Sequence, residues 1–83
     1  MTNLEALRKK IDAIDALVMV ELNQRFALMK EVKEAKIRLG VGVLDASREQ
    51  HILEKIEAFE YQKPIKEIYQ LIMKLSKDLQ RDK

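Results

Sequence analysis

The sequence has no cysteine or tryptophan, and it has only one proline, two glycines and one histidine. Without cysteine there is no disulfide framework and no thiolate nucleophile or metal ligand. His51 has no second histidine or cysteine to join it, so neither a zinc site nor a Ser-His triad can be built. Both glycines stand in one short segment and form no phosphate-binding loop. We therefore expect no metal and no cofactor.

The chain also has no large excess of positive or negative charge and no long apolar run. Sixteen basic and fourteen acidic side chains give a formal charge of +2, and they are intermixed along the chain. This balance gives no reason to expect binding to nucleic acid or to a membrane. The longest apolar run, residues 16–20, is far too short to span a bilayer, and no signal-peptide pattern precedes it. We expect a single domain over residues 1–83, located in the cytoplasm.

What the sequence does contain is helical periodicity. Apolar residues recur at steps of three and four from Leu4 to Leu39, as on one face of an amphipathic helix. A second periodic stretch follows the two glycines, and Pro64 is well placed at the start of a third. No stretch alternates with a period of two, so we predict an all-α fold. The predicted helices span about residues 3–39, 46–59 and 64–80.

The first predicted helix is too long for the rest of the chain to cover. At 1.5 Å per residue it would extend about 50 Å. A lone monomer would leave most of its apolar stripe in water, which soluble monomers rarely tolerate. We therefore expect a homodimer, most simply a two-fold dimer in which the long helices pack together.

Two cations interrupt the apolar face of the first helix. Arg25 and Lys36 lie on one row with Met29 and Val32, at steps of four, three and four. Buried there, they would need anionic partners, because an unpaired buried charge is costly. Alternatively, both side chains run along the edge of a coiled-coil seam with their charged ends in water. The spacing alone does not decide between these interpretations.

The other two predicted helices also place polar residues next to apolar faces. Glu49 extends the face of the second helix with Arg48 at its margin, and Asp45 precedes it as a candidate N-cap. Ser76 and Gln80 continue the apolar row of the third helix by steps of four. Taken singly, Glu49 fits a solvated first-turn carboxylate, Ser76 a small interface residue and Gln80 a surface residue. Their coincidence on three helices favours a shared interior site.

Several of these segments together resemble the helical (type II) class of chorismate mutases. Residues 7–15, LRKKIDAID, resemble the opening of that family, and residues 43–49, VLDASRE, resemble its turn into the second helix. Arg25 followed by Lys36, and Ser76 followed by Gln80, have the family's spacing. The resemblance covers nearly the whole chain and implies an intertwined homodimeric helical bundle with three helices per chain. It departs at residues 40–43, GVGV, where members often have a proline, and in the short connection 58–63.

This resemblance implies an enzyme that converts chorismate to prephenate by a [3,3]-sigmatropic rearrangement, in the biosynthesis of phenylalanine and tyrosine. The reaction needs no cofactor or metal. Its substrate is a dianion, and arginine suits carboxylates because its fork matches them bidentately. A donor placed at the ether oxygen would stabilise the charge that grows there as the C–O bond breaks.

The resemblance also implies the residues of the site, of which Lys36, Gln80, Arg25 and Glu49 would be catalytic. The implied contacts are Arg8 and Arg25 with the two carboxylates, Lys36 with a carboxylate and the ether oxygen, Gln80 with that oxygen, Glu49 and the backbone of Asp45 with the ring hydroxyl, Arg48 near the carboxylate end, and Ser76 with the ring carboxylate. Arg8 lies seventeen positions, about 25 Å, from Arg25 on one helix. It must therefore serve the partner's site, which makes each site composite.

Three other functions remain open at this point. An isochorismate pyruvate lyase would share this fold and a cationic pocket. A catalytically silent helical dimer attached to another enzyme, or a coiled-coil adaptor without a pocket, would share the apolar stripe. Lys36 and Gln80 discriminate, because a purely structural dimer has no use for two donors buried at one point.

Overall fold

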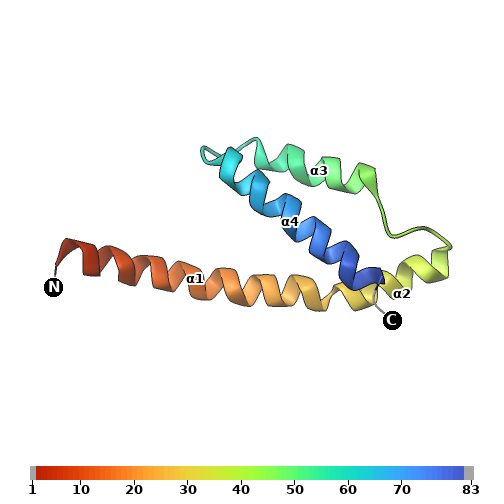
Figure 1. Ribbon diagram of the computed structural model, residues 1–83, viewed down its shortest axis with the longest axis horizontal. Helices are drawn as coiled ribbons and strands as arrows, with labels where there is room; N and C mark the ends of the chain where they lie inside the picture. Colours follow the sequence, from red (N-terminus) through yellow and green to blue (C-terminus); the bar gives the residue numbers. More distant parts are fainter. Residues whose placement is uncertain (1, 82–83) are drawn as a thin grey trace.

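A computed structural model of the chain describes residues 2–81, and all of its regular structure is helical. The elements are α1 (Asn3–Ala27), α2 (Met29–Leu39), α3 (Ala46–Ile56) and α4 (Gln62–Arg81). The predicted all-α class is therefore confirmed. Counted with α1 and α2 as one joined rod, the fold has the three predicted helices (Figure 1).

The long first helix is interrupted at a single residue, Leu28. The backbone of Leu28 stays in the right-handed helical region, and its N–H still donates to the carbonyl of Gln24 at 3.2 Å. No glycine or proline stands there, so the two segments run on end to end (Figure 1). At the start, the Thr2 hydroxyl accepts from the N–H of Glu5, as expected of an N-cap. At the far end, Gly40 adopts φ 70°, the left-handed conformation that closes many helices.

The bounds of the other two helices differ from those predicted. The second ends at Ile56, not near 59, because the next three N–H groups bond to carbonyls three residues back and tighten the chain into a 3₁₀-like turn. The third begins at Gln62, which places Pro64 as its third residue. Proline is tolerated there because the first-turn N–H groups have no helical partner to lose.

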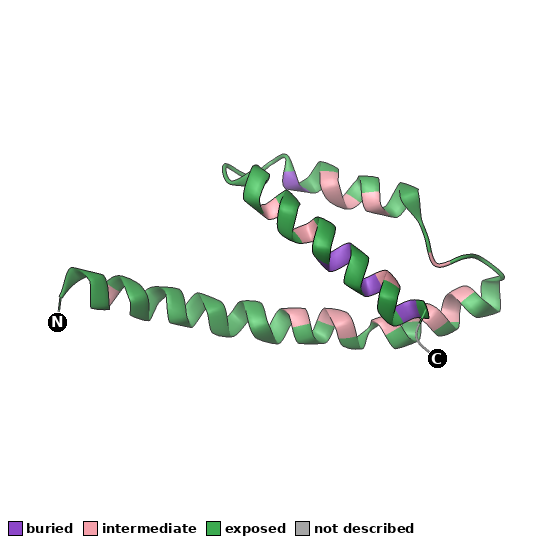
Figure 2. Ribbon diagram, in the orientation of Figure 1, coloured by how far each residue is buried: buried purple, intermediate pink, exposed green. Residues whose placement is uncertain are grey.

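The small core lies where α4 crosses the rod. Both α2 and α3 pack against α4, and the buried side chains of residues 2–81 lie on the last two helices (Figure 2). They are Ile56, Ile72, Met73, Ser76 and Gln80. No residue of α1 is buried, and its N-terminal half projects beyond the rest of the molecule (Figures 1 and 2).

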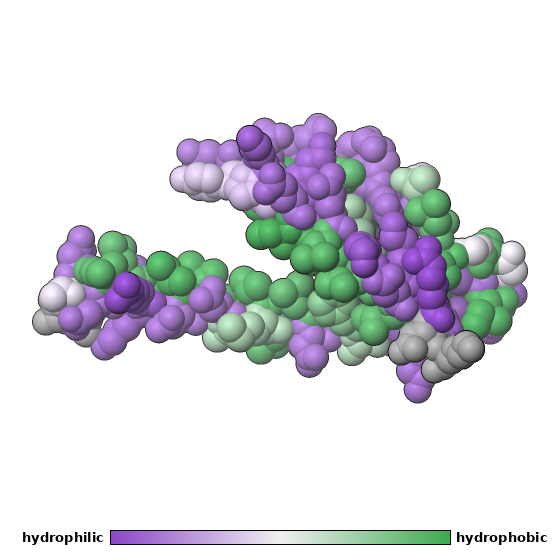
Figure 3. Space-filling model, in the orientation of Figure 1, coloured by the Kyte–Doolittle hydropathy of each residue, from purple (hydrophilic) through white to green (hydrophobic). Residues whose placement is uncertain are grey.

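The molecule is elongated. It extends 57 × 26 × 14 Å, with a radius of gyration of 16.3 Å, where a compact chain of this length would have about 12 Å. Its accessible surface is 6974 Å², compared with about 5,100 Å² for a compact monomer of the same mass. Apolar residues lie along one edge of the rod and in the hollow beside α4 (Figure 3).

Candidate active site

Seven of the eight residues that the sequence singled out line one half-open pocket of about 410 Å³ between the rod, α3 and α4. Four elements and the loop before α3 contribute to it. The seven are Arg25, Lys36, Asp45, Arg48, Glu49, Ser76 and Gln80. The apolar part of the lining includes Val32, Ile52 and Met73.

The ammonium of Lys36 joins three segments of the chain. Its Nζ donates to the backbone carbonyl of Val43 at 2.6 Å and to Oε1 of Gln80 at 2.7 Å. An ammonium has three N–H donors. These two bonds fix its position and leave one donor for a molecule in the pocket.

Arg25 is held from two sides. Its Nη1 donates to the hydroxyl of Ser76 at 2.7 Å, and its guanidinium carbon lies 6.0 Å from the centre of the Tyr69 ring. Ser76 in turn donates to the carbonyl of Ile72 at 2.7 Å. The guanidinium has five N–H donors, so this anchoring leaves several for an anionic ligand.

The Gln80 amide has a defined orientation. Its oxygen faces Lys36, because an ammonium can only donate. Its Nε2 donates to the Ser76 carbonyl at 3.3 Å and approaches the Met29 sulfur at 3.5 Å. The contact with the Ser76 carbonyl is long for an N–H···O bond, and sulfur is a weak acceptor. A better acceptor in the pocket can therefore displace the sulfur contact at little cost.

The start of α3 supplies the opposite wall. Asp45 is its N-cap, as the sequence suggested, and its Oδ1 accepts from the backbone N–H of Arg48 at 3.0 Å. Glu49 forms an ion pair with Lys77 of α4, with Nζ 3.0 Å from Oε2. Sequence reasoning missed Lys77, although it continues the row of Tyr69 and Met73 at steps of four.

The pocket carries more positive than negative charge. Four cations line it, Arg25, Lys36, Arg48 and Lys77, together with the two carboxylates of Asp45 and Glu49. The formal balance is +2. The buried polar side-chain atoms of residues 2–81 all have hydrogen-bond partners. Preplaced donors and a net positive charge suit a small dianion.

Arg8 lies elsewhere. It is exposed on the early turns of α1 and does not line the pocket. The helical rise places it about 25 Å along the rod from Arg25. A single chain therefore does not bring Arg8 to the other seven residues.

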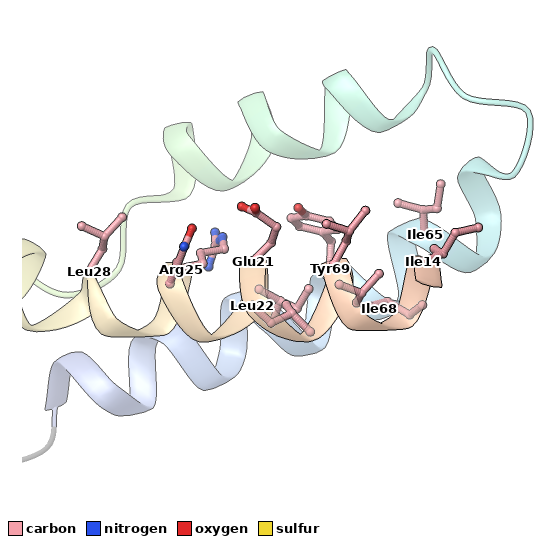
Figure 4. Close-up of a pocket in the computed structure, with 12 residues that line it drawn as sticks. Ile14, Glu21, Leu22, Arg25, Leu28, Ile65, Ile68 and Tyr69 are labelled. Atoms are coloured by element: carbon pink, nitrogen blue, oxygen red, sulfur yellow. The ribbon is translucent and has the colours of Figure 1, made fainter. Parts of the chain in front are cut away.

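A second depression, an open groove of about 680 Å³, runs between α1 and α4 (Figure 4). Its lining is mainly aliphatic and includes Ile14, Leu22, Leu28, Ile65 and Ile68. Arg25 lines both this groove and the polar pocket, so the two depressions meet at its side chain.

Residues 2–81 contain neither a metal-binding cluster nor a membrane-spanning helix. No cluster of three or more histidine, cysteine, aspartate or glutamate side chains is placed to hold a metal ion. No helix combines the length and the apolar character needed to cross a bilayer.

The fold and the site thus define an all-helical protein with a small pocket of net positive charge. Comparison with known proteins assigns the family. A family model described as chorismate mutase type II matches residues 7–81. A chorismate mutase of Methanocaldococcus jannaschii is 32% identical over 83 residues, covering 94% of this chain and 84% of that one. The chain belongs to the chorismate mutase type II family. The family predicted from the sequence is thus confirmed, and the chain is an enzyme of the isomerase class.

Proposed function

We propose that the chain binds chorismate in the polar pocket and converts it to prephenate by a [3,3]-sigmatropic rearrangement. The observation that carries this proposal is the meeting of Lys36 and Gln80, 2.7 Å apart, in a pocket that also holds Arg25. Family membership supports the same reaction. An interior surface made only for packing would not gather a cation and an amide at one point.

Electrostatics would bind the substrate. Chorismate carries two carboxylates, and the pocket has a formal balance of +2. Arg25 binds one carboxylate with the donors that Ser76 leaves unused, and Arg48 lies near the same end. Ser76 would donate its hydroxyl to the ring carboxylate in place of the Ile72 carbonyl, to which it donates in this structure. Holding both carboxylates restricts the substrate to its folded, reactive conformer, which removes part of the barrier.

Catalysis would come from donors at the ether oxygen. As the C–O bond breaks, negative charge grows on that oxygen, so a donor there binds the transition state more tightly than the substrate. Lys36 supplies its remaining N–H. The Gln80 amide exchanges its weak contact with the Met29 sulfur for the ether oxygen. Oε1 of Gln80 continues to accept from Nζ of Lys36, which keeps the Lys36 and Gln80 donors next to each other.

The ring hydroxyl would lie toward the start of α3. The Glu49 carboxylate is a pure acceptor there, and the backbone at Asp45 provides a second contact. These contacts orient the ring and take no part in the breaking or forming of bonds.

The active form would be a homodimer, as the sequence predicted. The chain exposes about a third more surface than a compact monomer of its mass, and Leu4, Ile11 and Ile14 of α1 are more than half exposed. If α1 of a second chain lay in the apolar groove between α1 and α4, the exposed residues of α1 and the groove itself would both be covered (Figure 4). Because that groove meets the pocket at Arg25, the partner's Arg8 can reach the site, which is then composite.

One assay tests the proposal and separates it from the isochorismate lyase. Purified protein should remove chorismate with prephenate as the product, measured by the loss of chorismate absorbance and by chromatography. Isochorismate should be offered in parallel. Formation of salicylate and pyruvate from isochorismate, with no prephenate from chorismate, would establish the lyase instead. No turnover of either would leave a catalytically silent dimer.

A further inference from the structure

Lys77 is a cation of the pocket for which the proposed reaction has, so far, no role. It follows Ser76 on α4, and its Nζ lies 3.0 Å from Oε2 of Glu49 on α3. The two side chains are only 23% and 27% exposed. The other lysine pair of this helix, Lys74 with Asp78, is 67% and 49% exposed and lies outside the pocket lining. The pair at Lys77 is thus the more shielded of the two and crosses between helices.

Glu49 presents a difficulty for any site that binds a dianion. Its carboxylate lines the same pocket as Arg25 and Lys36, where it would repel the charges of the substrate. Lys77 offsets this charge directly. Without Lys77 the formal balance of the pocket falls from +2 to +1, and Glu49 faces the substrate without a counter-ion.

The pair also fixes how Glu49 can bind. A carboxylate accepts through two oxygens, and Lys77 occupies Oε2. Oε1 remains for a hydroxyl in the pocket. A glutamate has several rotatable bonds, so the ion pair also restricts the positions that its carboxylate can take.

We infer that Lys77 is a positioning residue for substrate binding, which neutralises Glu49 and holds its carboxylate toward the ring hydroxyl of the substrate. This inference rests on the proposed function. The ring hydroxyl neither gains nor loses charge during the rearrangement. Its contact with Glu49 is therefore equally strong in the ground state and the transition state, and such uniform binding acts on KM and not on kcat.

The experiment compares Lys77→Met with the wild type in a chorismate mutase assay. We expect KM to rise about tenfold with kcat changed by less than about twofold, within the range of coupled charged pairs. Lys77→Arg, which keeps the charge, should restore KM to within about threefold of the wild type. The matched control is Lys74→Met, one turn earlier on α4, which should leave both constants unchanged.

A double-mutant cycle tests whether Lys77 acts through Glu49. In a Glu49→Gln background no carboxylate remains to be neutralised, so adding Lys77→Met should change KM by less than about twofold. Circular dichroism and the melting temperature identify folded variants. Should Lys77→Met not fold, Lys77→Gln, with a polar end at similar reach, is judged by the same criteria.

Two outcomes would overturn the inference: an unchanged KM in Lys77→Met, or an equal loss in the presence and absence of the Glu49 carboxylate. These results are distinct from a failure of the proposed function, in which the wild type itself makes no prephenate.

Discussion

The usual burial of apolar side chains and exposure of polar ones is reversed at both ends of the helical rod. In α1, Leu4 and Ile14 are 55% and 59% exposed, and no residue is buried. At the α2 end, where α4 crosses, the polar residues Ser76 and Gln80 are only 5% and 7% exposed. One end thus presents apolar surface to water, while the other keeps polar groups inside.

This difference in exposed side chains indicates the role of each end. Exposed aliphatic surface of this extent favours association with another chain. Buried polar groups are tolerated because each has a hydrogen-bond partner, and they are useful because their remaining donors are already in place. The rod would therefore assemble the dimer through one end and hold substrate at the other, with Arg25 where the two surfaces meet.

The largest effect is expected at the polar end. Lys36→Met removes the ammonium that the Val43 carbonyl and Gln80 hold in place, and kcat should fall by about 10²- to 10³-fold, as when one oxyanion donor is lost. Lys30→Met, on the exposed face of the same helix, is the control. Initial rates of chorismate loss provide the measurement. A decrease of less than about tenfold would show that Lys36 does not contact the reacting oxygen.

The proposed link between the two ends can be tested by mixing variants. Arg8→Ala and Arg25→Ala should each be nearly inactive as homodimers, because every composite site then lacks one arginine. Refolded together in equal amounts, half of the dimers are mixed, and each mixed dimer has one intact site. Activity should therefore recover to about a quarter of the wild-type value per chain.

Light scattering provides the control for this experiment, since both variants should keep the dimer mass. Mixtures that stay inactive while the dimer forms would show that Arg8 does not act in the partner's site. An Arg8→Ala homodimer with normal rates would contradict the composite site directly.

The smallest effect is expected at the junction itself. Tyr69→Leu removes the ring beneath the Arg25 guanidinium, and KM should rise by about two- to fivefold, the scale of an exposed cation–π contact. Tyr69→Phe keeps the ring and should behave as the wild type. Equal effects of the two substitutions would assign the loss to the phenol hydroxyl instead.

Much of this architecture can be predicted from local patterns. The three helices follow from steps of three and four, and Asp45 acts as the N-cap that its position before α3 suggested. Arg25, Lys36, Ser76 and Gln80 stand out because polar residues interrupt apolar rows. The same rows do not show that these side chains bond to one another, because those contacts join residues 44 and 51 positions apart.

Other features depend on tertiary geometry that periodicity does not encode. Lys77 lies one residue after Ser76, about 100° around the helix, so it stands outside the row of Ser76 and Gln80, and its pairing with Glu49 depends on α3 lying beside α4. The early end of α3 at Ile56 reflects a tightening of the last turn that residue type does not distinguish from continued helix. The Gln80 amide orientation follows only from its contact with Lys36.

The hydrogen bond from Lys36 to the Val43 carbonyl has a further consequence for which mutations the loop before α3 tolerates. Every amino acid carries the same carbonyl, so substitution at position 43 leaves the acceptor in place. A residue inserted into or deleted from the loop of residues 40–45 would instead move that carbonyl along the backbone, away from the ammonium. This contact therefore depends on the length of the loop and not on its amino-acid composition.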